Sequence, residues 1–500
     1  CSHRMREGTT DNPSRQPLSQ NHSQGLRPDT APPQAAPLAN GSPRSDALAG
    51  LPIQASQAVH QSSRGVLARS GTDRASGARS LYIHTPFCVH KCHYCDFYSF
   101  VDTRDQQHAF VERLCKELRA LAPHAATIDT IFVGGGTPSL LQPALWKRLL
   151  VALHDLFDLR NAAVPRKSDL PGRQPSAPAT PFEFTVECNP ESVTPELLGI
   201  LRDGGVNRVS IGAQSFNAAH LATLERWHRP ENVARAVDLA RAAGIERQSI
   251  DLIFAVPGQT LEQWRSDLSI ALSLGTTHLS CYDLTYEPNT AMTIRLRRGE
   301  FLPAPEDLEA DMFVLTGDTL ANAGLQRYEV SNYAVGGING PHACRHNLAY
   351  WRQQQWLAAG PSASGNIFAN PADPLAGSFR WKNTPNLGRY LEHDDDGYAP
   401  AIDIEPPSPA RALRERIMTG LRLSAGLHIP TIVQDARTLL SRGHLDARTP
   451  DLLASEARGL IGDGLLDPEQ AASGLWALAG RGWRLDDFAA RRLMACVREP

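Results

Sequence analysis

Short apolar runs alternate with longer amphipathic stretches between residues 80 and 325. The apolar runs have the length and composition of buried strands, and they fall at Leu81–Thr85, Thr130–Val133, Phe182–Glu187, Arg208–Gly212, Ser249–Phe254 and His278–Leu284. Stretches between them repeat apolar residues at helical spacing, namely Gln107–Leu121, Leu140–Leu156, Asn232–Ala243 and Leu261–Leu274. Repeated strand–helix units predict an α/β fold with a parallel sheet and helices outside it.

The pattern also divides the chain. Residues 1–79 contain no Phe, Trp or Tyr and are rich in Ser, Gln, Ala, Pro and Arg. Such a segment cannot bury enough apolar surface to offset the entropy of ordering, so we predict a disordered tail there rather than an organelle transit peptide. Residues 80–325 form the predicted core, interrupted by a proline-rich insertion at 161–181. A core-associated segment at 326–377 and a C-terminal domain at 378–500 follow.

Charge and hydropathy exclude two classes of partner. Lys and Arg total 50 against 53 Asp and Glu, which gives a net charge of −3 and no indication of a nucleic-acid partner. No apolar stretch reaches the roughly 18 residues needed to span a bilayer, so no membrane span is expected. Nine cysteines without a disulfide framework fit a reducing compartment, and we expect a cytoplasmic protein.

Three of the cysteines form a compact motif, Cys88-x3-Cys92-x2-Cys95, directly after the first predicted strand. Three thiolates can hold three irons of a [4Fe-4S] cluster, which leaves the fourth iron open to an outside ligand. A zinc site completed by His90 or His93 is disfavoured because these residues lie too close in sequence for a relaxed tetrahedron. A disulfide is disfavoured by the odd number of cysteines.

This motif resembles the radical S-adenosylmethionine (SAM) superfamily. The resemblance implies a (β/α)6 partial barrel in which the open iron binds the amino and carboxylate groups of SAM. In such barrels the chemistry gathers at the C-terminal ends of the strands. Polar and glycine residues follow the predicted strands at these ends: Gly134-Gly135-Gly136-Thr137-Pro138, Glu187, Gln214, Arg226 and Asp251. We interpret them as one pocket.

Longer segments resemble one family in the superfamily, the oxygen-independent coproporphyrinogen III oxidase family, from about residue 80 to the C-terminus. They include Tyr82-Ile-His-Thr-Pro-Phe-Cys88, Ser210-Ile-Gly-Ala-Gln-Ser-Phe216 and Asp251-Leu-Ile-Phe-Ala-Val-Pro-Gly258. The resemblance places these residues at the SAM site: Tyr82, Tyr94, Gly135, Gly136, Thr137, Glu187, Gln214, Arg226 and Asp251. It also implies that the C-terminal domain is mostly helical and similar to a winged helix. Without a basic stripe, we interpret that domain as a lid or a partner surface.

The family contains heme chaperones and decarboxylating enzymes. The enzymes usually carry a further cysteine two residues after the last cluster ligand, where this chain has Phe97. His346-Asn-Leu-Ala-Tyr350 matches the HNxxY motif that the chaperones associate with heme, and imidazole and phenolate are both known axial ligands of heme iron. On a helix, positions four apart share one face. Related proteins often continue with Gly-Pro-Ser-Ala-His-Ser, whereas Gly360-Pro-Ser-Ala-Ser-Gly365 lacks the histidine.

These patterns favour a heme chaperone that carries a SAM-bound [4Fe-4S] cluster and transfers heme to client hemoproteins, with an electron donor as a further partner. The alternative is an enzyme, an oxygen-independent coproporphyrinogen III oxidase that forms protoporphyrinogen IX by radical SAM chemistry. Whether the chain is an enzyme stays open, and no catalytic residue is assigned. A simple electron carrier is disfavoured because it would need no SAM pocket.

Overall fold

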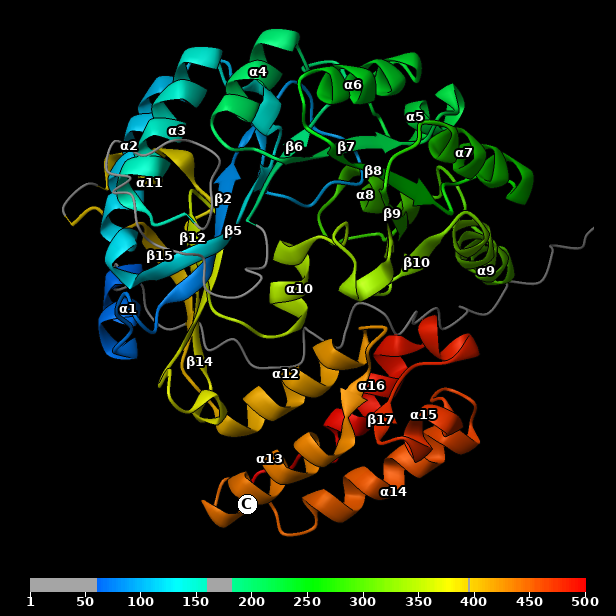
Figure 1. Cartoon of the computed structure of the whole chain (residues 1–500). Coiled ribbons are helices and arrows are strands. Elements are labelled where there is room, and N and C mark those ends of the chain that lie inside the picture. The colour runs from blue at the N-terminus through cyan, green and yellow to red at the C-terminus, as the bar shows by residue number, and fades with distance from the viewer. Residues whose placement is uncertain (1–60, 160–181, 394–395) are drawn as a thin grey trace, which may run out of the picture. The chain divides into compact units, whose positions relative to one another are not determined.

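The computed structural model describes residues 61–159, 182–393 and 396–500. The predicted insertion at 161–181 and residues 1–60 of the predicted tail therefore lie outside the described residues. Six parallel neighbouring strands form the centre of the sheet (Figure 1): β2 (Ala78–Thr85), β5 (Ala125–Gly135), β6 (Glu183–Cys188), β7 (Arg208–Gln214), β8 (Arg247–Phe254) and β9 (His278–Asp283). Each contains or overlaps one of the strands predicted from the apolar runs, and the predicted α/β barrel fold is confirmed.

Helices connect these strands and lie along the outer face of the sheet (Figure 1). They are α2 (Gln107–Leu121), α3 (Pro143–Leu156), α4 (Pro195–Asp203), α5 (Ala218–Thr223), α6 (Glu231–Ala242) and α7 (Leu261–Ser273). Two helices follow β9: α8 (Ala291–Arg297), where the Met292 N–H donates to the His93 carbonyl oxygen at 2.8 Å, and α9 (Glu306–Asn322), which packs against α7. On β7, Val209 and Ile211 enter the hydrophobic core under the helices, whereas Arg208 and Ser210 line a cavity. This alternation is the period of two that a strand imposes.

Further strands extend the sheet at both edges, so its linear strand order does not close. Beyond β9 lie β11 (Asn332–Val335) and β10 (Leu325–Arg327), both antiparallel. Beyond β2 lies β12 (Trp356–Ala359), which is parallel to it. Antiparallel strands then follow, namely β13 (Ser364–Phe368), β14 (Ser378–Asn383), β15 (Pro400–Glu405) and β1 (Gln61–Ser62). Helix α10 (Arg345–Trp351) precedes β12, and α11 (Leu387–Glu392) follows β14.

The predicted N-terminal tail extends too far. Residues 61–79 form β1, helix α1 (Ser63–Ser70) and the start of β2. Val66 and Leu67 of α1 are almost fully buried, at 0% and 1% exposure, and belong to the same core as the parallel strands. This apolar pair and the pairing of β1 with β15 hold the segment against the sheet, although its composition is that of a solvated chain.

The boundary predicted at residue 378 falls between two strands of one sheet. Residues of β14 pair with β13 along most of their length, and Phe379 and Trp381 belong to the sheet's core. A second core begins only at Ala410. It is built by α12 (Pro409–Leu421), α13 (Ile429–Ser441), α14 (Thr449–Gly462), α15 (Pro468–Ala472), α16 (Asp486–Met494) and the short pair β16 (Leu427–His428) and β17 (Leu475–Trp476).

Candidate functional site

The three motif cysteines follow β2 and form the cysteine loop, partly exposed and with free thiols. Cys88 ends the two-residue strand β3 (Phe87–Cys88), and Cys92 and Cys95 come after it. Two of the three thiols accept a hydrogen bond from a residue elsewhere in the barrel. The Thr137 hydroxyl donates to Cys88 Sγ at 3.5 Å, and Arg226 Nη1 donates to Cys92 Sγ at 3.7 Å. Burial raises the pKa of Cys95 to about 11, with a further contribution from the neighbouring Cys92 and Cys88 thiolates. The three thiols therefore lie near one another.

Within the described residues, no three His, Cys, Asp or Glu side chains converge on the position of a single metal ion. The two histidines of the loop have other partners. His90 stacks on Trp227 with ring centroids 3.9 Å apart, and His93 Nδ1 lies 3.2 Å from Arg295 Nη1. A [4Fe-4S] cluster takes one thiolate on each of its irons, so three neighbouring thiols that do not converge on one ion fit a cluster better than a mononuclear zinc site.

The glycine turn after β5 packs against the cysteine loop itself. Gly135 has φ of 107°, and a Cβ there would lie 2.5 Å from the His84 ring. A Cβ on Gly136 would lie 2.6 Å from the Phe87 carbonyl oxygen. The Thr137 N–H donates to that same carbonyl at 2.7 Å. The glycines are thus needed for the chain's own close approach, and the turn brings the Thr137 hydroxyl to Cys88.

His84, which the sequence patterns did not single out, supports this turn. Its Nε2 lies 2.7 Å from the Tyr98 carbonyl oxygen, and its Nδ1 lies 3.1 Å from the Tyr82 hydroxyl. Burial lowers the pKa of His84 to about 4, so the ring is neutral. The role of His84 in supporting the turn is visible only from its position beside Gly135 in the fold, because the residues next to it in the sequence do not indicate it.

Glu187 and Asp251 lie on the parallel strands β6 and β8, on either side of β7. The Gly135 N–H donates to Glu187 Oε2 at 3.1 Å, and the Ser210 hydroxyl donates to Asp251 Oδ2 at 3.0 Å. Burial, helped by the nearby Asp251 carboxylate, raises the pKa of Glu187 to about 8. Burial also raises the pKa of Asp251. Both carboxyl groups therefore hold their protons to higher pH than they would in water.

Gln214 and Arg226 meet at the end of β7. Gln214 has φ of 63° and follows a register shift in the pairing with β8, a left-handed geometry that a non-glycine residue adopts at a cost. Arg226 Nη2 donates to the Gly212 carbonyl oxygen at 3.0 Å, while its Nε has no partner within the described residues. Tyr94 packs beside Leu224 and Met292, and burial raises its pKa.

A cavity of about 330 Å³ lies inside the barrel. Five of the predicted ligand-binding residues line it: Tyr82, Glu187, Asp251, His346 and Tyr350. The other predicted residues lie outside its lining: Cys88, Cys92, Cys95, Tyr94, Gly135, Gly136, Thr137, Gln214 and Arg226. The predicted site residues thus form two groups, one around the cysteine loop and one around the cavity. The hydrogen bond between Glu187 and the Gly135 N–H connects the two groups.

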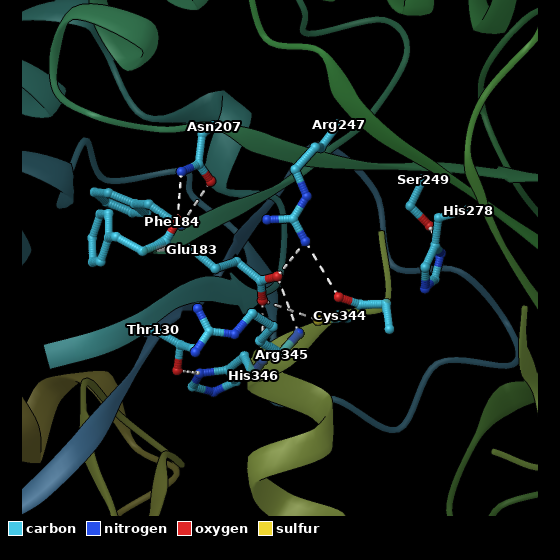
Figure 2. Close-up of polar contacts among 12 residues, drawn as sticks. Thr130, Glu183, Phe184, Asn207, Arg247, Ser249, His278, Cys344, Arg345 and His346 are labelled. Atoms are coloured by element: carbon cyan, nitrogen blue, oxygen red, sulfur yellow. Dashed lines mark hydrogen bonds and ion pairs between the residues drawn. The ribbon is translucent and has the colours of Figure 1, made fainter. Parts of the chain in front are cut away.

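His346 and Tyr350 lie on α10, and their ring centroids are 5.0 Å apart, so they share one face as expected. His346 stacks near Phe132, with centroids 5.4 Å apart, and is 3% exposed. Its Nδ1 lies 2.9 Å from the Thr130 hydroxyl (Figure 2). Thr130 lies in the middle of β5, whereas the cysteine loop follows the C-terminal end of β2.

Glu183 holds the start of α10 in place, a role that no sequence pattern indicated. Its buried carboxylate accepts from the backbone N–H groups of Arg345 and His346, each at 3.0 Å, and from Arg247 Nη2 at 2.7 Å (Figure 2). Burial alone would raise its pKa, but Arg247, Arg208 and the backbone donors lower it to about 2. A charged carboxylate at a helix N-terminus satisfies N–H groups that lack partners within the helix.

None of the described helices combines the length and the hydropathy needed to cross a bilayer.

Comparison with known proteins identifies the family to which this site belongs. A model of the radical SAM superfamily matches residues 82–270. A protein of Lactococcus lactis named heme chaperone HemW is 35% identical over 351 residues, which cover 70% of this chain and 82% of that protein. The heme chaperone HemW of Mycobacterium tuberculosis is 32% identical over 419 residues, covering 83% and 94%.

Among solved structures, the radical SAM coproporphyrinogen III oxidase HemN of Escherichia coli superposes with a TM-score of 0.67, covering 86% of this chain and 92% of that one at 21% identity. At that identity the likeness shows the fold alone. Radical SAM proteins use SAM and a [4Fe-4S] cluster, which fits the three neighbouring thiols of the cysteine loop. The extent and identity of the matches show that this chain belongs to the HemW family of radical SAM proteins.

Proposed function

We propose that the chain is a heme chaperone, which binds heme, carries a SAM-bound [4Fe-4S] cluster and transfers heme to client hemoproteins in the cytoplasm. Cys88, Cys92 and Cys95 hold the cluster in this proposal. The residues around the glycine turn and strand ends hold SAM, and His346 and Tyr350 contact heme. Relatives named as heme chaperones support heme as the cargo.

The free nitrogen of His346 is the observation that carries the proposal. The Thr130 hydroxyl donates to Ser80 Oγ at 2.9 Å, so toward His346 it acts as acceptor, and the imidazole proton lies on Nδ1. Nε2 then carries an unprotonated lone pair, and it is buried without a hydrogen-bond partner in the described part of the chain. Burial lowers the pKa of His346 to about 4, so this form persists at neutral pH.

A neutral imidazole whose other N–H is fixed by a hydrogen bond is the usual protein ligand of a metal. His346 lines the cavity, so a ligand that enters the cavity would meet the imidazole ring. Tyr350 also lines the cavity, but burial raises the pKa of its phenol and disfavours the phenolate that iron binds. His346 is therefore the proposed axial ligand, and Tyr350 packs against the porphyrin.

Phe97 supports the chaperone over the decarboxylating enzyme. It occupies the position at which the related enzymes usually carry a further cysteine, and its side chain is 58% exposed. A phenyl ring at this position supplies neither a thiol nor a proton for chemistry beside the cluster.

Heme titration tests the proposed ligand. We expect cluster-reconstituted protein to bind one equivalent of heme, with the Soret band of a histidine-ligated iron. His346→Ala should lose that band and bind heme at least about tenfold more weakly, the loss expected of an iron ligand. His342→Ala is the matched control, since this partly buried histidine of the same segment does not line the cavity. Equal spectra for the wild-type protein and His346→Ala would contradict the assignment.

A turnover assay tests the chaperone against the enzyme. Reconstituted protein is incubated without oxygen with coproporphyrinogen III, SAM and a reductant, and porphyrins and 5′-deoxyadenosine are quantified. We expect no protoporphyrinogen, and we expect heme-loaded protein to transfer its heme to a heme-free cytochrome, read as a shift of the Soret band. Protoporphyrinogen formed over many turnovers would overturn the chaperone proposal.

A further inference from the structure

Arg208 is a buried arginine inside the barrel. It is the first residue of β7, its side chain lines the cavity that His346 and Tyr350 also line, and it is only 2% exposed. The next inward position, Ser210, lines the same cavity. Arg208 thus places a guanidinium group inside the barrel, on the side of β7 that faces away from the helices.

No described residue neutralises this guanidinium by direct contact. Its Nε is buried without a hydrogen-bond partner, and no carboxylate of the described residues lies within ion-pairing distance of it. Glu183 is the nearby charged carboxylate, but its acceptor positions are taken. Four donors occupy it: Arg247 Nη2 at 2.7 Å, Cys344 Sγ at 3.5 Å and the N–H groups of Arg345 and His346 at 3.0 Å (Figure 2). A carboxylate offers about four such positions.

The other carboxyl groups of the cavity do not supply a full countercharge either. Asp251 accepts from the hydroxyl groups of Ser210 and Ser249, at 3.0 Å and 3.3 Å. Burial raises the pKa values of Asp251 and Glu329 and brings that of Glu187 to about 8. Burial thus disfavours the charged form of every one of these acids. Burying a charge is costly, and the nearby Cys344, Glu183, Tyr328 and Asp251 offset that cost and raise the pKa of Arg208. None of them hydrogen-bonds to the guanidinium, however, so its fork is left for an anionic group of a ligand in the cavity.

We propose that Arg208 binds a carboxylate group of the ligand that occupies this cavity. The planar fork of a guanidinium matches a carboxylate through two parallel hydrogen bonds. Two ligands of the proposed function carry this group: heme, through its propionates, and SAM, through its amino-acid carboxylate. The inference rests on the proposed function only where heme is the source.

The test compares ligands with and without the carboxylate. Cluster-reconstituted wild-type protein and Arg208→Gln are titrated with heme, with heme dimethyl ester, in which both propionates are blocked, and with SAM. If a propionate is the partner, the wild-type protein prefers heme to the ester about tenfold, or ~1.4 kcal/mol, and Arg208→Gln loses that preference without losing SAM affinity. If SAM is the source, Arg208→Gln weakens SAM binding about tenfold and leaves the heme preference unchanged.

Unchanged affinities for all three ligands in a folded Arg208→Gln protein would overturn the inference and leave Arg208 as a countercharge to Glu183. Arg202→Gln, on the exposed side of α4, is the control and should bind like the wild-type protein. If Arg208→Gln does not fold, Arg208→Lys decides, because it keeps the charge but loses the fork, and the selectivity should fall part of the way. A wild-type protein that binds no heme would contradict the proposed function, and the SAM titration would then decide the role of Arg208.

Discussion

Donors from elsewhere in the barrel reach two thiols of the cysteine loop. Arg226 contributes a positive charge beside Cys92, and the Thr137 hydroxyl points at Cys88. The thiolate is the form of cysteine that binds iron. For Cys95, burial outweighs the nearby donors and holds its pKa above the usual value. Iron binding must therefore displace a proton from Cys95.

Replacing one ligand tests the cluster. Cys92→Ala removes one of three thiolates, and two cannot hold three irons, so we expect reconstituted protein to lose most of its iron, its sulfide and its cluster absorbance. Cys496→Ala is the control, because that thiol is buried in the separate C-terminal core and should leave the cluster unchanged. A full complement of iron and sulfide in Cys92→Ala would show that the ligand assignment is wrong.

Glu187 gives the folded chain a pH dependence with a definite sign. Its folded pKa is about 8 against the usual 4.5, because burial and Asp251 disfavour the charged form. As the pH rises, the unfolded chain releases this proton first, so the free energy of unfolding falls between about pH 5 and pH 8. The loss is at most roughly 5 kcal/mol, since the two pKa values differ by about 3.5 and each pKa unit corresponds to about 1.4 kcal/mol.

Thermal unfolding of the metal-free chain across this pH range measures the effect. Glu187→Gln cannot ionise, so the stability difference between wild-type protein and variant should change steadily from pH 5 to pH 8, with the variant gaining relative stability. A difference that stays constant with pH would show that Glu187 ionises normally in the folded chain.

At the scale of elements, the sequence patterns located the parallel strands because buried strands leave continuous apolar runs. They did not locate Glu183 as the residue that holds α10, because its partners Arg247, Arg345 and His346 are far away along the chain and only the fold brings them together. The sequence patterns did not indicate a role for Arg208 for the same reason. A charged residue at the start of a strand looks solvated until the neighbouring strands enclose it.

The prediction of a disordered tail fails at helix α1 for a different reason. The polar composition of residues 1–79 suggests a solvated chain, but the adjacent apolar residues Val66 and Leu67 are buried in the core. This burial predicts that Leu67→Ala lowers the free energy of unfolding by about 2–5 kcal/mol, the range for a deleted core leucine. Gly65 on the same helix is exposed, and a methyl group added there would meet no atom within 4 Å. Gly65→Ala should therefore stabilise by about 0.5–1 kcal/mol through helix propensity. Urea unfolding measures both, and an unaffected Leu67→Ala would show that α1 does not pack on the sheet.

The described part of the molecule has two small hydrophobic clusters and two large hydrophobic cores. One unites α1, the parallel strands, their covering helices and β14. The other lies within the helical segment from Ala410 to Val497. The family resemblance anticipated a helical C-terminal domain but placed its start at residue 378, because strands that extend an existing sheet carry no sequence mark of the sheet they join. We propose that the helical domain starts at Pro409.

The separate cores predict two unfolding transitions in the full chain. Leu268 of α7 and Leu460 of α14 are both fully buried, each in a different core. Leu460→Ala should destabilise the C-terminal domain by about 2–5 kcal/mol, which for a domain of this size lowers its transition by roughly 10 °C or more. Leu268→Ala should lower the other transition and leave that one in place. Calorimetry of both variants resolves them, and a single transition that moves equally in both would mean that the cores unfold as one cooperative unit.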